Sequence, residues 1–287
     1  MDKKIILITG ASSGIGRTTA LELAKQGHQV IIHGRDAEKT KAVFDEAVQI
    51  AGAGNVAMFT ADLSLKSAVK AFAQEIAAKY DRLDVLINNA GGQFGETRLV
   101  TAEGHERTFA INTLAPFLLT SLLLPLLKKS SSARVVTVSS ASYTAGGEVP
   151  WDDIELEHHY SLTKSYGLSK RYVWWLMRKF AADLAAGGIA NVTVNTCEPG
   201  SAKTNLARES MKETWFKVLM FLWKPMMWSV EKAAATSVYL ATSPDVEGVS
   251  GKFFGNCKEL KIKDKFISSD SERKIWDYCA KACEGYL

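Results

Sequence analysis

The sequence predicts an α/β fold, with one doubly wound parallel sheet of about seven strands and helices on both of its faces. Short apolar runs, often β-branched, alternate along the chain with longer segments of helical periodicity, which is the pattern of right-handed βαβ units. The first run, residues 5–8, is apolar throughout, as expected of a strand covered on both faces. Because no repeat or linker divides residues 1–287, we expect a single domain.

Each expected strand is a short apolar run, and each expected helix repeats apolar residues at intervals of three and four. We expect strands at residues 5–8, 29–33, 56–60, 83–87, 133–138, 192–197 and 252–255. We expect helices from about residue 15 and over about 36–51, 64–80, 102–128, 164–186, 230–241 and 269–284. Ser64 is expected to cap its helix, since a hydroxyl accepts from free N–H groups. Pro116 is expected to bend the helix around it.

The composition is that of an ordinary globular protein. The 287 residues, 47% hydrophobic and 23% charged, suffice for one large domain with a sizeable core. The net charge of +4 is spread along the chain, so we expect no nucleic-acid-binding surface. The densest basic run, residues 258–265, is interrupted by Glu259 and Asp264 and is expected to be a solvated surface.

The short N-terminal apolar run and the spacing of the cysteines lead us to expect a cytoplasmic protein. The apolar run after Lys3 and Lys4 is too short for a signal peptide or an N-terminal membrane anchor. The most apolar segment, residues 118–127, is shorter than a membrane span and contains Pro125. The cysteine spacing matches no metal or redox motif, so we expect no metal site and free thiols in a reducing compartment at Cys197, Cys257, Cys279 and Cys283.

A glycine-rich turn separates the first strand from the first helix, where residues 9–16 run T-G-A-S-S-G-I-G. Gly10 allows a tight turn with positive φ, and Gly14 lets backbone N–H groups approach a diphosphate. Gly16 lets the helix pack close to the strand. The helix N-terminus favours negative charge. The strand, the glycines and the helix therefore together predict a dinucleotide site at the carboxyl ends of the strands.

A tyrosine and a lysine four residues apart provide acid–base chemistry. Tyr166 and Lys170 share one face of a helix. A free tyrosine has a pKa of about 10, and a nearby ammonium is expected to lower it. The hydroxyl then becomes a general acid or base near neutral pH. Ser140, at the end of a strand, is placed to donate to a substrate oxygen where charge develops.

Taken together, these motifs resemble the short-chain dehydrogenase/reductase family, nearest to its retinol-dehydrogenase-like and carbonyl-reductase branch. The matching segments follow in the family's order over essentially the whole chain: T-G-A-S-S-G-I-G at 9–16, N-N-A-G at 88–91, Asn112 in A-I-N-T, Ser140 in V-S-S, Y-G-L-S-K at 166–170 and E-P-G-S-A-K-T at 198–204. The resemblance implies a single-domain Rossmann fold and an oxidoreductase. It also implies a catalytic set of Asn112, Ser140, Tyr166 and Lys170, in which the asparagine holds a water that connects the lysine to solvent.

The resemblance also implies which residues hold the cofactor. Asp62 and Leu63 are expected at the adenine, Asn89 at the adenosine ribose and Thr204 at the nicotinamide carboxamide. The full set expected to contact the cofactor is Gly10, Ser12, Ser13, Gly14, Ile15, Gly16, Arg17, Arg35, Asp62, Leu63, Asn89, Ala90, Gly91, Tyr166, Lys170, Pro199, Gly200 and Thr204.

The catalytic tyrosine has a competitor, because Tyr160 and Lys164 form a second Tyr-x-x-x-Lys pair six residues earlier. Tyr166 is favoured because Ser169 precedes the second lysine, as in the family pattern. Gly167 follows Tyr166, as in many similar members, and the helix then continues for a usual length.

Ser139 competes with Ser140 in the same way. Neighbouring strand residues point to opposite faces of a sheet, so the two hydroxyls cannot do the same work. Ser140 is favoured, since the second serine of the pair matches the family's catalytic position.

Arginines near the adenosine end favour NADP(H) over NAD(H). An acid at the end of the second strand binds the ribose 2′-OH of NAD, whereas arginine accommodates the 2′-phosphate of NADP. Here Arg35 holds that strand end and Asp36 follows it. Arg17, just after the glycine motif, is a second cation within reach. Two guanidinium groups suit a dianion.

Two segments bear on the substrate and the subunit state. The stretch from Ser140 to Tyr166 is about twice the family's usual length, so residues 146–159 look like an insertion, which in similar members lies beside the active site and obstructs a tetramer interface. The chain is therefore expected as a monomer or a homo-oligomer. Residues 206–228 are crowded with Trp, Phe, Met and Leu and are expected to cover a lipophilic substrate. Ordinary core, a subunit contact and peripheral membrane contact are the alternatives.

The sequence thus predicts an NADP(H)-dependent oxidoreductase that transfers a hydride between nicotinamide and a lipophilic carbonyl or alcohol, with Tyr166 as general acid/base. The alternative is a regulatory or scaffold protein that binds the nucleotide without turnover. The complete set of asparagine, serine, tyrosine and lysine argues against that alternative.

Overall fold

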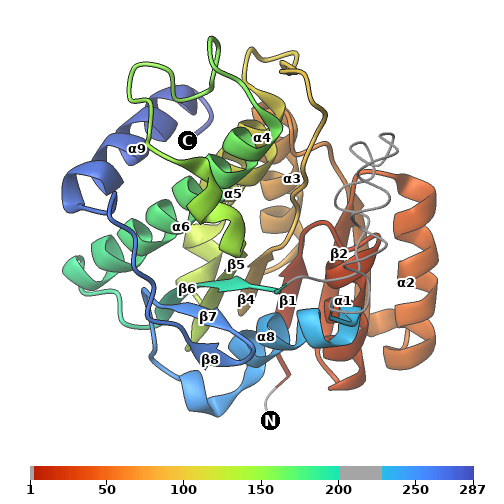
Figure 1. Ribbon diagram of the computed structural model, residues 1–287. Helices are drawn as coiled ribbons and strands as arrows, with labels where there is room; N and C mark the ends of the chain where they lie inside the picture. The colour runs from red at the N-terminus through yellow and green to blue at the C-terminus, as the bar shows by residue number, and fades with distance from the viewer. Residues whose placement is uncertain (1–2, 201–227) are drawn as a thin grey trace.

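The computed structural model describes residues 3–200 and 228–287, which form an eight-stranded sheet with helices on both faces (Figure 1). The strand order is β3-β2-β1-β4-β5-β6-β7-β8, and the neighbours are parallel except for β7 and β8. The predicted doubly wound α/β fold is confirmed. The strands are β1 (Ile5–Ile8), β2 (Gln29–Gly34), β3 (Val56–Thr60), β4 (Val85–Asn88), β5 (Ala133–Val138), β6 (Val192–Glu198), β7 (Phe253–Gly255) and β8 (Lys258–Glu259).

The helices cover the sheet in two layers, because successive strand residues point to opposite faces. The helices are α1 (Gly14–Lys25), α2 (Ala37–Ala51), α3 (Lys66–Lys79), α4 (Arg107–Phe109), α5 (Ala115–Leu127), α6 (Leu162–Ala186), α8 (Val230–Thr242) and α9 (Ser269–Ala282). Ile6 and Ile8 belong to the core cluster that includes residues of α1, α2 and α8, whereas Leu7 belongs to the cluster that includes residues of α3, α5, α6 and α9. The chain also contains 3₁₀ turns at Ala53–Asn55, Ala141–Gly146 and Pro244–Val246.

The segment predicted as one helix over 102–128 is interrupted. A π-helical turn, Ala110–Leu114, separates α4 from α5. Pro116 is the second residue of α5, so the irregularity falls directly before the proline. Among the described residues, Arg107–Leu127 is the one helical stretch long and apolar enough to cross a membrane. Its most apolar window is 78% buried inside the protein, as in a core helix.

The N-terminus of α3 is capped differently from the prediction. Ser64 is not the N-cap, since the helix begins after Leu65, and the backbone N–H of Ser64 donates to Asp62 Oδ1 at 3.0 Å. The carboxylate of Glu103 instead accepts from the backbone N–H groups of residues 66 and 67, at 2.5 and 3.0 Å. A residue distant in sequence therefore replaces the local hydroxyl.

The sheet topology gathers the predicted site residues at one edge. β1 lies between β2 and β4, so the connections run in opposite directions from it. Ligands bind at such a switch point, beyond the carboxyl ends of the strands. The glycine turn follows β1, the N-N-A-G motif begins at the end of β4, and Ser139 and Ser140 follow β5. Residues 199–200 follow β6.

Candidate active site

The glycine turn forms a backbone cradle at the start of α1. Gly10 has φ +65°, and a Cβ there would lie 2.7 Å from the Cα of Ala90, so the two loops touch through their backbones. Ser13 is the N-cap of α1 but makes no side-chain capping bond. The first N–H groups of the helix therefore suit an anion better than a protein side chain. This arrangement fits the diphosphate of a dinucleotide.

The N-N-A-G motif is attached to the glycine turn. The Thr9 hydroxyl accepts from the backbone N–H groups of Asn89 and Ala90, both at 3.0 Å. The side-chain nitrogen of Asn89 donates to the carbonyls of Thr9 and Gly10, at 2.8 and 3.2 Å. Asn89 thus ties the two loops together through its side-chain nitrogen, and its contact with the adenosine ribose stays a prediction.

His33 is a residue of this site that the sequence reasoning missed. Its Nδ1 accepts from the backbone N–H of Gly10 at 3.3 Å, and its Nε2 lies 3.2 Å from the carbonyl oxygen of Ala61. The side chain thus connects the glycine turn to the end of β3. Burial lowers the pKa of His33 to about 4, so the ring is neutral and holds a single tautomer. A histidine one residue before the end of a buried strand was the available signal.

Asn112 and Lys170 meet at the backbone of Gly91. Asn112 lies in the π-helical turn, where its amide exchanges two hydrogen bonds of 2.9 Å with the backbone of Gly92 and donates to Ser169 Oγ at 3.0 Å. Lys170 Nζ donates to the carbonyl of Val138 at 3.0 Å. A Cβ on Gly91 would lie 2.9 Å from Asn112 Oδ1 and 3.1 Å from Lys170 Nζ. The glycine therefore leaves room for both side chains.

Tyr166 lies beside Ser140 and Lys170. Its ring centroid is 5.8 Å from Lys170 Nζ, and its hydroxyl interacts with the Ser140 side chain. Burial raises the pKa of Tyr166 to about 12, and the interaction with Ser140 offsets only part of that rise. Burial also lowers the pKa of Lys170 to about 8. The expectation that the lysine lowers the pKa of the tyrosine is therefore wrong for the protein alone, because desolvation dominates. Tyr166 keeps its proton at neutral pH.

The competing tyrosine and serine have other partners. Tyr160 precedes α6, and its hydroxyl donates to the carbonyls of Phe94 and Gly95 at 3.2 and 3.3 Å. Ser139 is buried, and its hydroxyl donates to the backbone carbonyl of Lys170 at 2.8 Å. The hydroxyls of Tyr160 and Ser139 thus bind backbone carbonyls of neighbouring segments. The geometry therefore favours Tyr166 and Ser140 as the reacting pair.

Charged side chains surround the expected adenosine end. Arg35 is exposed at the end of β2. Asp36 turns away to cap α2, where its carboxylate accepts from Lys39 N at 3.0 Å and from Lys39 Nζ at 2.5 Å. Arg17 pairs with Glu46 of α2 at 2.5 Å, and both side chains are 42% exposed. The acid beside Arg35 is therefore engaged, while Arg35 faces solvent.

A family profile described as short chain dehydrogenase matches residues 4–215. The chain belongs to the short-chain dehydrogenase family. It is 40% identical over 292 residues to retinol dehydrogenase 14 of Homo sapiens, covering 96% of this chain and 85% of that protein. It is 33% identical to a protein of Streptomyces sp. (strain C5) assigned as a daunorubicin C-13 ketoreductase, covering 97% and 92%.

Solved structures agree with the family. A Mycobacterium paratuberculosis protein superposes with a TM-score of 0.76 at 27% identity, covering 97% of this chain and 92% of that one. A short-chain dehydrogenase of Shigella flexneri, solved in complex with NADP, gives a TM-score of 0.69 at 26% identity, covering 90% and 98%.

The remaining predicted contacts of the dehydrogenase lie at two further strand ends. Asp62 and the buried Leu63 follow β3. Pro199 and Gly200 follow β6, and the ring of Trp228 lies against Gly200. Thr204, and all of the segment 206–228 except Trp228, lie outside the described residues.

The insertion of the dehydrogenase packs against α6. Val149, Ile154 and Leu156 are buried, so this segment contributes to the core. Trp151 stacks on Trp175 of α6, with ring centroids 6.4 Å apart and an interplanar angle of 23°. The insertion therefore covers part of the helix that carries Tyr166.

Proposed function

We propose that this dehydrogenase transfers a hydride between NADP(H) and a lipophilic carbonyl or alcohol. The observation that carries the proposal is the meeting of four side chains beside the nucleotide cradle: Asn112, Ser140, Tyr166 and Lys170. Because the family acts on CH–OH groups and the matching residues are in contact, turnover is favoured over nucleotide binding alone.

The side chains divide the work of carbonyl reduction. When bound, NADPH supplies the hydride. The hydroxyl of Ser140 donates to the substrate oxygen and holds it where negative charge develops. Tyr166, which burial keeps protonated, gives its proton to that oxygen. Lys170, as an ammonium, stabilises the phenolate that remains, and Asn112 fixes the turn of backbone next to the lysine.

The choice of NADP(H) is supported at the adenosine end. Arg35 and Arg17 supply two guanidinium groups for a 2′-phosphate. Asp36, which would bind a ribose hydroxyl in an NAD enzyme, is occupied as a helix cap. Structures of family members from Shigella flexneri and Escherichia coli carry NADP and NADPH.

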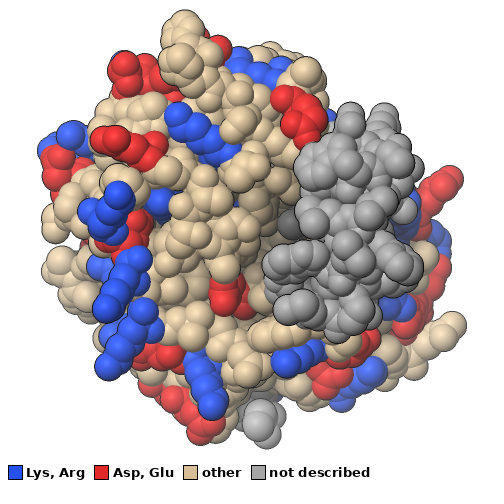
Figure 2. All heavy atoms as spheres, viewed as in Figure 1, with Lys and Arg blue, Asp and Glu red and all other residues tan. Residues whose placement is uncertain are grey.

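A lipophilic substrate is supported by the relatives. The relatives are named for retinol and daunorubicin. The centre of the face shown in Figure 2 is largely uncharged, and charged side chains gather toward its periphery.

The four free thiols fit a cytoplasmic location.

Replacement of Tyr166 by phenylalanine tests the proposal. Tyr166→Phe should abolish NADPH oxidation with aldehydes, ketones or quinones, while NADPH binding, followed by its fluorescence, is retained. Tyr160→Phe is the matched control and should keep turnover, because the Tyr160 hydroxyl donates to the carbonyls of Phe94 and Gly95. NADPH binding without turnover by the wild-type chain on a broad panel would favour the scaffold alternative. Loss of turnover in Tyr160→Phe alone would reassign the tyrosine.

A further inference from the structure

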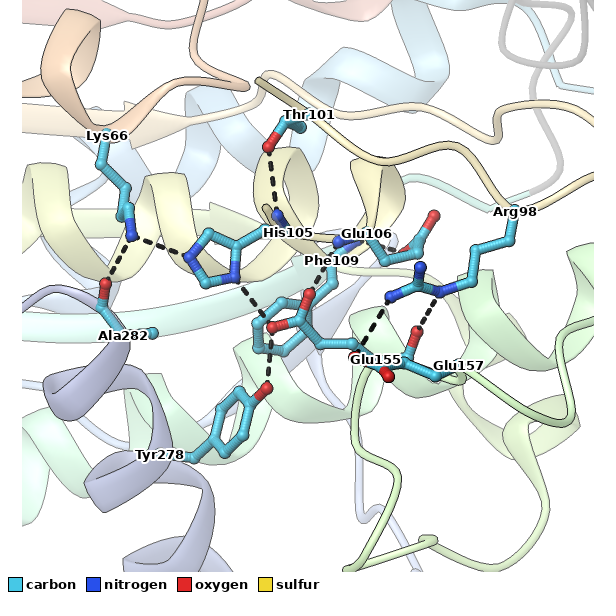
Figure 3. A network of polar contacts seen from close by, with 10 residues as sticks. All are labelled: Lys66, Arg98, Thr101, His105, Glu106, Phe109, Glu155, Glu157, Tyr278 and Ala282. Carbon is cyan, nitrogen blue, oxygen red and sulfur yellow. Dashed lines mark hydrogen bonds and ion pairs between the residues drawn. The ribbon is translucent and has the colours of Figure 1, made fainter. Parts of the chain in front are cut away.

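A buried carboxylate of the insertion lies outside the catalytic set. Glu155 is 7% exposed and accepts three hydrogen bonds: from His105 Nδ1 at 2.8 Å, from the backbone N–H of Glu106 at 2.7 Å and from the hydroxyl of Tyr278 at 2.7 Å (Figure 3). These donors come from the loop before α4 and from α9. Three segments distant in sequence therefore meet at one side chain.

The three donors keep Glu155 ionised. Burial alone would raise the pKa of its carboxyl, but the bonds from His105, Glu106 and Tyr278 outweigh burial and hold the pKa below its ordinary value. Lys66 Nζ donates to His105 Nε2 at 2.8 Å, so the ring proton is on Nδ1 and points at Glu155. Loss of any one of these partners would leave a buried polar group without its hydrogen bond and would destabilise the folded protein.

Glu106 connects this cluster to α4, which precedes Asn112, and to α6, which carries Tyr166. Its backbone N–H is held by Glu155, while its own carboxylate accepts from Thr108 N and Phe109 N, both at 2.8 Å, and so caps α4. The same carboxylate accepts from Ser165 Oγ at 3.1 Å. α4 leads directly into the π-helical turn that carries Asn112, and Ser165 immediately precedes Tyr166.

The other side of the cluster anchors the C-terminal helix. Tyr278 belongs to α9, and Lys66 Nζ also donates to the carbonyl of Ala282 at 2.7 Å, at the end of α9. Figure 3 shows Lys66, His105, Glu155 and Tyr278 as a connected series. The position of α4 is thereby coupled to the docking of α9 and of the insertion.

We propose that Glu155 is a positioning residue for the reaction. Through the backbone of Glu106 it fixes the relative placement of Asn112 and Tyr166, and it makes that placement depend on the docked insertion and α9. This inference rests on the proposed function only for its readout in turnover.

The substitution Glu155→Gln tests it. Glutamine keeps the shape of the side chain, but its N–H₂ group faces a group that donates to Glu155 in the wild-type protein, so one of the three hydrogen bonds is lost. We expect kcat to fall about 10-fold, while the Kd for NADPH changes less than about twofold. Hydrogen exchange at residues 107–114 should become faster. Glu157→Gln is the matched control, since Glu157 is exposed and lies 3.9 Å from Arg98; it should change neither quantity.

Two further measurements separate positioning from general stability. Turnover is expressed per NADPH-binding site at a temperature where thermal melts show every variant folded. Tyr278→Phe removes one of the two donors to Glu155 Oε1 and leaves the Glu106 N–H on Oε2, so this variant should lower kcat less than Glu155→Gln does. An unchanged kcat in Glu155→Gln, even with a lower melting temperature, would overturn the proposal. Absence of turnover in the wild-type chain would refute the proposed function, and exchange at 107–114 would then decide this inference.

Discussion

Replacement of Gly91 by alanine should impair turnover without unfolding the protein. The backbone at Gly91 is outside the left-handed region, so alanine is compatible with it. The new methyl carbon would lie 2.9 Å from Asn112 Oδ1 and 3.1 Å from Lys170 Nζ, whereas ordinary contact begins at 3.4 Å. One or both side chains must therefore move by a few tenths of an ångström.

The size of the effect follows from what holds the two side chains. Asn112 has three hydrogen bonds to keep it in place, whereas Lys170 has a flexible stem and one bond to Val138. We expect the lysine to shift freely, and Asn112, which has the shorter contact, to move against its hydrogen bonds. Since misplacing a reacting group by 1 Å costs about 100-fold, a shift of about half that size should lower kcat about 10-fold, or ~1.4 kcal/mol.

The assay is NADPH oxidation with a fixed carbonyl substrate, together with a thermal melt. Gly54→Ala is the matched control, because a Cβ there meets nothing within 4 Å. Full activity of Gly91→Ala at an unchanged melting temperature would refute the assignment of Asn112 and Lys170 to the reacting centre.

Two further predictions concern charge. Glu46→Gln should tighten NADPH binding about threefold and leave NADH binding unchanged, because it frees Arg17 from a competing carboxylate. Asp45→Asn is the control, since the partner of Asp45 is Lys41. Equal effects of Glu46→Gln on both cofactors in a fluorescence titration would contradict this reasoning. Carbonyl reduction should slow as pH rises through about 8, since burial lowers the pKa of Lys170 to about 8 and the neutral amine no longer stabilises the phenolate, while Tyr166 stays protonated to about 12. A kcat/KM profile that is flat between about pH 6 and about pH 10 would exclude that role.

The sequence predicted the elements whose signals are local. Strands buried on both faces are continuous apolar runs in the sequence, and the glycines of residues 9–16 predicted the backbone cradle before α1. The π-helical turn was missed because its residues have the apolar periodicity of an ordinary helix. β8 was missed because two residues carry no periodicity.

The site was predictable as a set of residues but not as an electrostatic environment. Spacing placed Tyr166 and Lys170 on one helical face, yet it could not show that burial raises the pKa of the tyrosine and lowers the pKa of the lysine. Similarly, Glu155 looked like one of several acids in an insertion. Its role depends on Tyr278, more than one hundred residues away in sequence, and no local pattern reports such a contact.

The hairpin between β7 and β8 determines how the sheet meets other molecules. Asn256 and Cys257 both have positive φ, which matches the two-residue turn that reverses a strand tightly. The returning strand, Lys258–Glu259, is two residues long, exposed and charged on both positions. An incoming strand from a second molecule would find a short edge with two charges to desolvate. The hairpin therefore protects this side of the sheet from edge-to-edge aggregation.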